Sequence, residues 1–111
     1  MLPDYPNDAT GNNLSRLKAA GSDMKSPMVI EFQVVLPSEA VAKKFDDSVK
    51  QRGFTTAIRK HDNDSNWEVA CSKEMLPTHA GILGLQNELS QSAKPLGGYC
   101  NTWGSFGNKP V

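Results

Sequence analysis

The side chains that could take part in covalent, acid–base or metal chemistry are few and scattered along this sequence. Cys71 and Cys100 have no second cysteine or histidine beside them at metal-ligand spacing, and His61 and His79 lie far apart. A zinc site needs about four such ligands. We therefore expect no metal and no cofactor, and we expect both cysteines to be reduced and packed.

His79 comes closest to an acid–base residue, and it follows Thr78 at the expected start of a helix. The helix dipole disfavours a protonated imidazole at that end. No serine or cysteine accompanies His79 at the spacing of a nucleophile motif. We therefore predict no catalytic residue and no enzyme, and we keep His79 as a candidate partner-binding residue.

Basic side chains are concentrated between residues 39 and 60, where six of them stand against three acids. A solvated helix face accounts for such mixed charge. The alternative is a docking patch for an acidic partner or for an RNA backbone, with Lys43 and Lys44 as its first candidates. The six basic residues are Lys43, Lys44, Lys50, Arg52, Arg59 and Lys60.

Trp103 is the second kind of candidate, because it precedes Gly104 close to the end of the sequence. A tryptophan there either closes the core or anchors a protein partner, since this residue is enriched at the energetic centres of interfaces. Trp67 lies in a cleanly alternating run, and we expect it in the core.

The length and composition of the chain limit the class of protein to which these candidate residues can belong. The chain has 111 residues, with 12 basic and 12 acidic side chains, and its mean hydropathy is −0.47. No apolar run approaches the roughly 20 residues of a membrane span, and the first residues lack the pattern of a signal peptide. We expect a cytoplasmic location, a peripheral segment with a short helix over 1–23, and a single domain over 24–111.

Hydrophobic periodicity predicts the elements that position these residues. Alternation predicts strands over 28–36, 54–59, 67–72 and 99–106, and the polar run 61–66 predicts the turn of a hairpin. Stripes of apolar residues predict helices over 38–52 and from 78 to about 93, with Ser38 and Thr78 as their N-caps. A shorter helix is expected around 14–20, ended by Gly21. We expect close packing against the sheet to explain Gly81 and Gly84.

The predicted order of strand, helix, strand, strand, helix, strand indicates an α+β protein with a ferredoxin-like βαββαβ sandwich. Its four-stranded antiparallel sheet should have the order 4-1-3-2, with two helices on one face. Cys71 and Cys100 would then lie about 10 Å apart, too far for a disulfide. The predicted core consists of Ile30, Phe32, Val34, Val41, Phe45, Val49, Trp67, Val69, Ile82, Leu85 and Leu89.

From about Met24 to Phe106 the chain resembles the RraB family of protein regulators of ribonuclease E. Trp103 and Gly104 match the last two residues of the family's aspartate-glycine-tryptophan-glycine signature. Asn101 and Thr102 stand in place of its aspartate and first glycine. The resemblance rests on a strand rich in valine and phenylalanine, a helix with its phenylalanine, Gly53-Phe54, Trp67-Glu68-Val69, Met75-Leu76-Pro77-Thr78-His79 and Gly98–Gly104.

The resemblance implies a ferredoxin-like fold and a non-catalytic protein that inhibits ribonuclease E by protein–protein contact, through a surface that includes Asn101, Trp103 and Gly104. One alternative is direct RNA binding by the basic helix and hairpin edge. Another is a small-molecule-binding domain of the same fold, although we expect no such ligand. RNA-recognition modules carry stacking aromatic residues on the open face of the sheet, where this chain is expected to have Glu31 and Gln33. This argues against the hypothesis of direct RNA binding.

Overall fold

The computed structural model describes residues 8–60, 66–105 and 107–108, so His61, Phe106 and most of the predicted hairpin turn lie outside the described residues. None of the described helices is long and apolar enough to cross a membrane. The elements are α1 (Ala9–Ala19), β1 (Met28–Leu36), α2 (Glu39–Lys50), β2 (Thr55–Lys60), β3 (Trp67–Met75), α3 (His79–Ala93), the 3₁₀ turn η1 (Lys94–Leu96) and β4 (Tyr99–Gly104).

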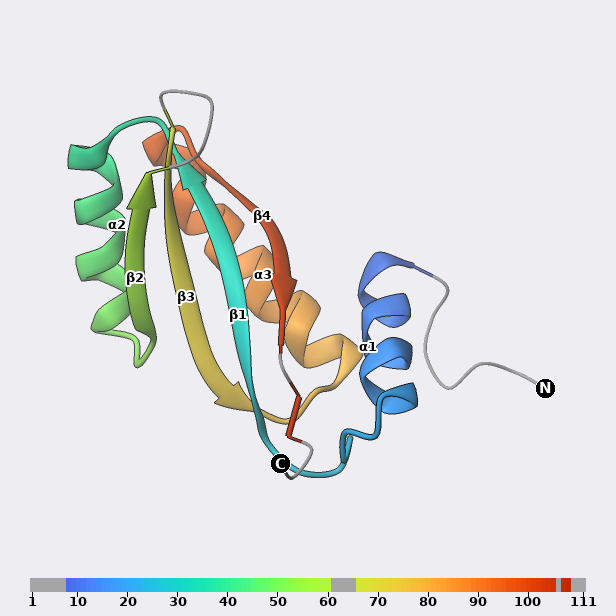
Figure 1. The fold of residues 1–111 in the computed structure, drawn as a ribbon. Helices are drawn as coiled ribbons and strands as arrows, with labels where there is room; N and C mark the ends of the chain where they lie inside the picture. The colour runs from blue at the N-terminus through green and yellow to red at the C-terminus, as the bar shows by residue number, and fades with distance from the viewer. Residues whose placement is uncertain (1–7, 61–65, 106, 109–111) are drawn as a thin grey trace.

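The four strands form one antiparallel sheet with the order β2-β3-β1-β4 (Figure 1). Read from the other edge, this is the predicted order 4-1-3-2, and the α+β class is confirmed. β1 lies inside the sheet, where it pairs with β3 over its whole length. β3 continues to Met75, three residues beyond the predicted end at Ser72, because those residues pair with the first part of β1.

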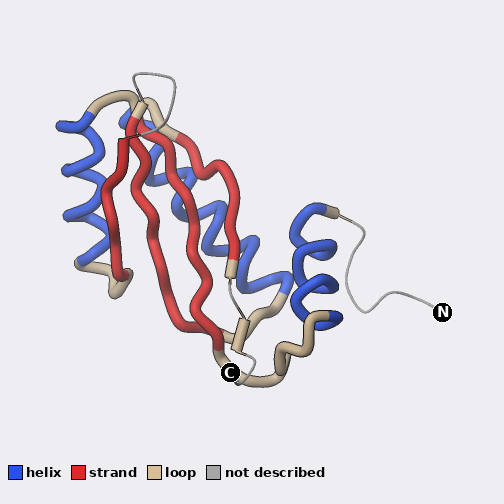
Figure 2. The backbone as a smooth tube through the Cα atoms, in the orientation of Figure 1, coloured by secondary structure: helices blue, strands red, loops and turns tan. Residues whose placement is uncertain are grey.

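Helices α2 and α3 cover the same face of the sheet (Figure 2). The Ser38 hydroxyl caps α2 by accepting a hydrogen bond from the Val41 backbone N–H at 3.3 Å, and the Thr78 hydroxyl caps α3 in the same way through Gly81 at 3.1 Å. These caps satisfy backbone donors that a helix start leaves unpaired. Both helix starts are therefore where the sequence predicted them.

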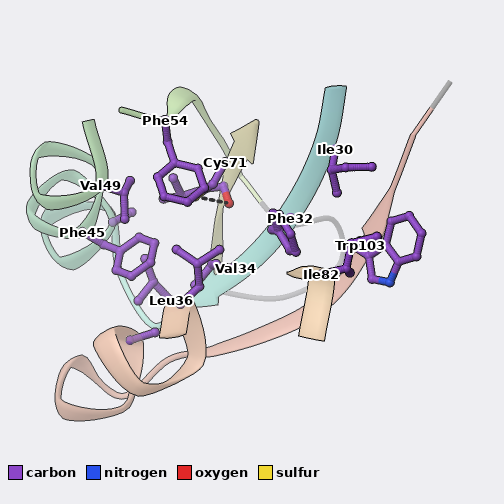
Figure 3. Packing of buried hydrophobic residues seen from close by; sticks show 14 of the residues in the cluster. Ile30, Phe32, Val34, Leu36, Phe45, Val49, Phe54, Cys71, Ile82 and Trp103 are labelled. Carbon is purple, nitrogen blue, oxygen red and sulfur yellow. Dashed lines mark hydrogen bonds between the residues drawn. The ribbon is translucent and has the colours of Figure 1, made fainter. Parts of the chain in front are cut away.

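One continuous hydrophobic core fills the space between the sheet and the helices. Phe45 and Val49 lie toward one end of it, and Trp103 lies at the other end beyond Ile30 and Ile82 (Figure 3). All eleven predicted core residues belong to this cluster or pack against it. Three of them are only partly buried and form its margin: Val41, Trp67 and Leu85.

The glycines of α3 are not explained by close approach to the sheet backbone. A Cβ atom on Gly84 would meet nothing within 4 Å, so that prediction is wrong for Gly84. On Gly81 it would lie 2.7 Å from the Thr78 hydroxyl, which is the capping group of the helix. Close approach to the sheet does occur at Gly98, where a Cβ atom would come within 2.5 Å of the Val35 carbonyl oxygen.

Helix α1 is longer than predicted and contributes to the core. It begins at Ala9 because the Asp8 carboxylate accepts a hydrogen bond from the Gly11 backbone N–H at 2.7 Å. The predicted start of this helix near residue 14 is therefore too late, and Thr10 and Gly11 are buried while Leu14 is fully buried in the core. Residues 1–7 lie outside the described residues, and independent folding of 24–111 stays a prediction.

Candidate functional site

Trp103 connects β4 to α1 and is buried, with 5% of its surface exposed. It pairs with Phe32 in the sheet, and its indole Nε1–H donates a hydrogen bond to the Thr10 hydroxyl at 3.2 Å. The Trp103 carbonyl accepts a second bond from the side-chain amide of Asn13 at 3.4 Å. The indole ring therefore holds α1 against the sheet and is more buried than Trp67.

His79 also contacts α1, from the first position of α3. Its Nε2 atom lies 2.9 Å from Oδ2 of Asp8, the residue that caps α1. The hydrogen bond from the Gly11 N–H lowers the pKa of the Asp8 carboxyl below its ordinary value, and the contact with His79 lowers that pKa further. His79 thus joins the starts of two helices, which is a structural use of its ring.

The residues that receive these contacts, Asp8 and Thr10, lie at the start of α1, and the sequence analysis missed them. Asp8 and Thr10 are separated from their partners by more than 70 positions in the chain. The available signal was an aspartate followed three positions later by Gly11, with Thr10, Leu14 and Leu17 repeating at helical spacing. That signal indicates a capped helix with one apolar stripe.

Two backbone groups on the outer edge of β4 are bonded to side chains of helices. The Cys100 backbone N–H, which does not point to β1, donates to the Ser90 hydroxyl on α3 at 3.2 Å. The Trp103 carbonyl is occupied by Asn13 from α1. Edge groups that are already bonded do not template strand pairing. These two groups are therefore not available to pair with a further strand.

Gly104 ends β4, and nothing inside the described structure requires a glycine there. Its backbone is not among the glycines with positive φ, and a Cβ atom on it would meet no atom within 4 Å. Glycine weakens a strand, and in that setting it often marks a place where another molecule comes close. Gly104 therefore adjoins open space at the end of β4.

Two hollows adjoin Gly104 and the neighbouring Ser105. One, of about 400 Å³, lies on the sheet face away from the helices and is lined also by Val29, Glu31 and Ser72. The other, of about 430 Å³, lies between α1 and the end of β4. Gly104 and Ser105 form the ridge between them, so a partner seated on either hollow touches this ridge.

Asn101 is exposed two residues before Trp103. The register between β1 and β4 shifts there, because Cys100 pairs with Val34 while Thr102 pairs with Gln33. Asn101 is the extra residue of a β-bulge, which bends a strand and redirects its side chains. Asn101 and Gly104 both lie on β4, and a shared contact surface for them stays a prediction.

Lys43 and Lys44 lie on α2, which packs beside β2 at the opposite edge of the sheet from β4 (Figure 1). Both are exposed, and the Lys43 ammonium is 4.0 Å from the Glu39 carboxylate. The structure therefore does not bring these two lysines together with Asn101, Trp103 and Gly104.

Most of the other basic side chains between 39 and 60 are paired with carboxylates. Lys50 pairs with Asp46 at 3.0 Å, and the guanidinium of Arg52 pairs with Glu88 on α3. Arg59 pairs with Glu68 at 2.9 Å and with Glu31 at 3.2 Å, on the sheet face opposite to α2. The basic residues are therefore divided between two faces and largely neutralised.

The two cysteines are free, as predicted. Burial raises the pKa of the Cys71 thiol to about 12 and that of the Cys100 thiol to about 11. A thiol nucleophile acts as the thiolate, so neither side chain is activated at neutral pH. No cluster of three or more potential metal ligands occurs among residues 8–60, 66–105 and 107–108, and His61 is outside these ranges.

Comparison with known proteins places the whole described fold in one family. The model of the family "Regulator of ribonuclease activity B" matches residues 7–105, and the match includes α1, which the sequence resemblance from about Met24 had left out. Searches of curated proteins and of solved structures found no match to the sequence. The chain belongs to the RraB family, the regulators of ribonuclease activity B.

Proposed function

We propose that this protein regulates a ribonuclease by binding it directly, without catalysing a reaction itself, and that the ribonuclease is ribonuclease E. Its site of action is the cytoplasm of a bacterium. Membership in a family of ribonuclease regulators supports a protein partner. The strand order with both crossover helices on one face supports the finer assignment of the fold as ferredoxin-like.

The observation that carries the proposal is Gly104. It is a glycine that neither backbone conformation nor internal packing requires, and it stands between two hollows. The contact surface is therefore the ridge of Gly104 and Ser105 with the walls of the two hollows. Asn101 extends this surface along β4. Trp103 and His79 support it from inside by holding α1 in place.

Direct RNA binding is not favoured by these observations. An RNA site of this kind depends on several unpaired cations that neutralise neighbouring phosphates. Here Lys50, Arg52 and Arg59 already have carboxylate partners, and Arg59 lies on the face opposite to α2. The open sheet face carries Glu31 and Glu68 across β1 and β3.

Gly104→Val tests the proposal. A β-branched residue suits a strand, and the space around the Gly104 Cβ position is empty, so the free energy of unfolding should not fall. Binding to purified ribonuclease E of the same organism should weaken by about tenfold or more, because the added side chain separates the two surfaces. Inhibition of RNA cleavage should fall in parallel.

Gly84→Ala is the matched control, since Gly84 also has empty space around its Cβ position but lies on α3. It should leave binding unchanged and stabilise the helix by up to about 1 kcal/mol. Equal binding of ribonuclease E by the unaltered chain and Gly104→Val would remove the proposed surface. Absence of any binding by the unaltered chain would remove ribonuclease E as the partner.

A further inference from the structure

The hollow of about 430 Å³ between α1 and the end of β4 is called the groove below. We infer that this groove binds an acidic segment of the protein partner, and that a carboxylate of the partner pairs with the Arg16 guanidinium. This inference rests on the proposed function, because it takes the ridge at Gly104 as a contact surface. It adds the chemistry of the partner segment and the residue that recognises it.

The groove has one helical wall and one strand wall. One side is lined by Asn13, Arg16 and Leu17 of α1 and by Ala20 just after it, and the other side by Trp103 and the ridge of Gly104 and Ser105. Its volume is about 430 Å³, which is room for one or two side chains. Leu17 and Ala20 give it an apolar wall, and Arg16 and Asn13 give it polar groups.

Arg16 differs from the other two arginines in having no ion-pair partner among residues 8–60, 66–105 and 107–108. The sequence contains three arginines, and both Arg52 and Arg59 are held in ion pairs. Among the residues that the structure describes, no carboxylate or hydrogen-bond acceptor contacts the exposed Arg16 guanidinium. A guanidinium presents five N–H donors in a planar fork that matches a carboxylate. Arg16 therefore offers an unused carboxylate site in the wall of the groove.

The helix dipole by itself explains the presence of Arg16 less well than a ligand does. A cation in the last turn of a helix is favourable, but Lys18 already provides one in the last turn of α1. Arg16 differs from Lys18 in lining the hollow that adjoins Gly104. The combination of an unpaired guanidinium, an apolar wall and an unrequired glycine is what indicates a ligand.

A protein segment fits this groove better than RNA does. A phosphate backbone carries one charge per nucleotide and is bound by rows of cations. Arg16 is the one charged side chain among the described residues that line the groove, and its neighbours Leu17 and Ala20 are apolar. An acidic residue next to an aliphatic residue satisfies both features, since the carboxylate meets Arg16 while the aliphatic side chain covers Leu17.

The groove is also formed before the partner binds. The helical wall is fixed by the bond from Trp103 to Thr10 and by the contact between His79 and Asp8. Leu14, fully buried, anchors the same helix in the core. Because α1 is already ordered, the partner does not have to supply the free energy of ordering it.

The test compares Arg16→Gln with Lys94→Gln, which removes the same charge from the exposed start of η1. Binding of full-length ribonuclease E to each full-length variant is measured at 50 mM and 300 mM salt. Arg16→Gln should raise Kd by about tenfold at low salt, the effect of one charged hydrogen-bonded pair, and Lys94→Gln should stay within about twofold. The salt dependence should be weaker in Arg16→Gln than in Lys94→Gln.

A charge-swap experiment then identifies the partner group. Arg16→Glu should bind ribonuclease E more weakly than Arg16→Gln, because two carboxylates would face each other. Among single Asp→Lys and Glu→Lys variants of ribonuclease E, at least one should restore binding to Arg16→Glu and to no other variant of this chain. Restoration by none of them would overturn the inference.

The other outcomes separate the inference from the proposed function. Unchanged binding in Arg16→Gln together with weakened binding in Gly104→Val would overturn the acidic-segment inference and leave the proposed function standing. Failure of the unaltered chain to bind ribonuclease E would overturn both. Tight binding of a 15-nucleotide single-stranded RNA that is lost in Arg16→Gln would show an RNA site instead, and would also overturn the inference.

Discussion

Replacing Leu14 by alanine tests whether α1 is an integral part of the fold. Leu14 is fully buried and belongs to the core cluster, although it lies in the part of the sequence that was expected to be peripheral. Truncation removes three carbon atoms, worth about 0.8 kcal/mol each, or about 2.4 kcal/mol before any cavity. Measured Leu→Ala losses in cores run from about 2 to 5 kcal/mol.

We expect about 3 kcal/mol for Leu14→Ala, near the lower part of that range, because α1 can shift to fill part of the cavity. α1 has 11 residues and includes Gly11 and two asparagines, so it is too short and too weak a helix former to persist without its packing. Its amide hydrogens should therefore also exchange faster in the variant. Urea unfolding curves give the free energy, and hydrogen exchange reports on α1 itself.

Leu76→Ala is the control for the same chemical change at a site that is 49% exposed. It should lower the free energy of unfolding by no more than about 0.5 kcal/mol. If the losses in Leu14→Ala and Leu76→Ala are equal and small, then α1 does not stabilise the fold and the account of Trp103 and His79 as its anchors is refuted.

Three further predictions concern the core, acid stability and the thiols. Phe45→Ala should lower the free energy of unfolding by about 3–5 kcal/mol, measured in urea, whereas Glu31→Ala, on the open sheet face, should lower it by about 0.5 kcal/mol. Equal losses would mean that the wrong face of the sheet has been assigned to the core. The pKa of Asp8 is lower in the folded protein than its ordinary value of 3.8, so its contribution to stability is present above that pH and is lost as the pH falls below it. The stability difference between the unaltered chain and Asp8→Ala should accordingly be larger at pH 5 than at pH 2.5, and a constant difference would contradict this. With a pKa of about 11, Cys100 should react with a thiol reagent at pH 8 about a hundredfold more slowly than free cysteine, and Cys71, with a pKa of about 12, about a thousandfold more slowly. Unfolding in urea should abolish this protection.

Trp103 and Gly104, the two residues that match the end of the family's signature, have different surroundings in this structure. Trp103 is buried and acts inward on Thr10, whereas Gly104 faces open space. The two neighbours therefore differ in their surroundings: Trp103 holds α1, and in the proposed function the space at Gly104 receives the partner. Variants of Trp103 should affect stability and binding together, and variants of Gly104 should affect binding alone.

Much of the architecture was predictable from the sequence because its signals are local. Ile30, Phe32 and Val34 alternate, and Phe45 and Val49 repeat at helical spacing, so each element and its buried face follow from a few neighbouring residues. The sheet order follows from the sequence of elements and the handedness of crossovers. Serine and threonine caps at Ser38 and Thr78 set the helix starts for the same local reason.

The position of α1 and the nature of the candidate surface were decided only by tertiary structure. The sequence of α1 is polar, and its order depends on partners more than 70 positions away, Trp103 and His79. Whether Arg16 and Arg59 have carboxylate partners depends on which strands and helices lie side by side. The empty space at Gly104 likewise depends on how the neighbouring elements pack. Local periodicity carries no information about such contacts, because they form between elements that the chain brings together only when it folds.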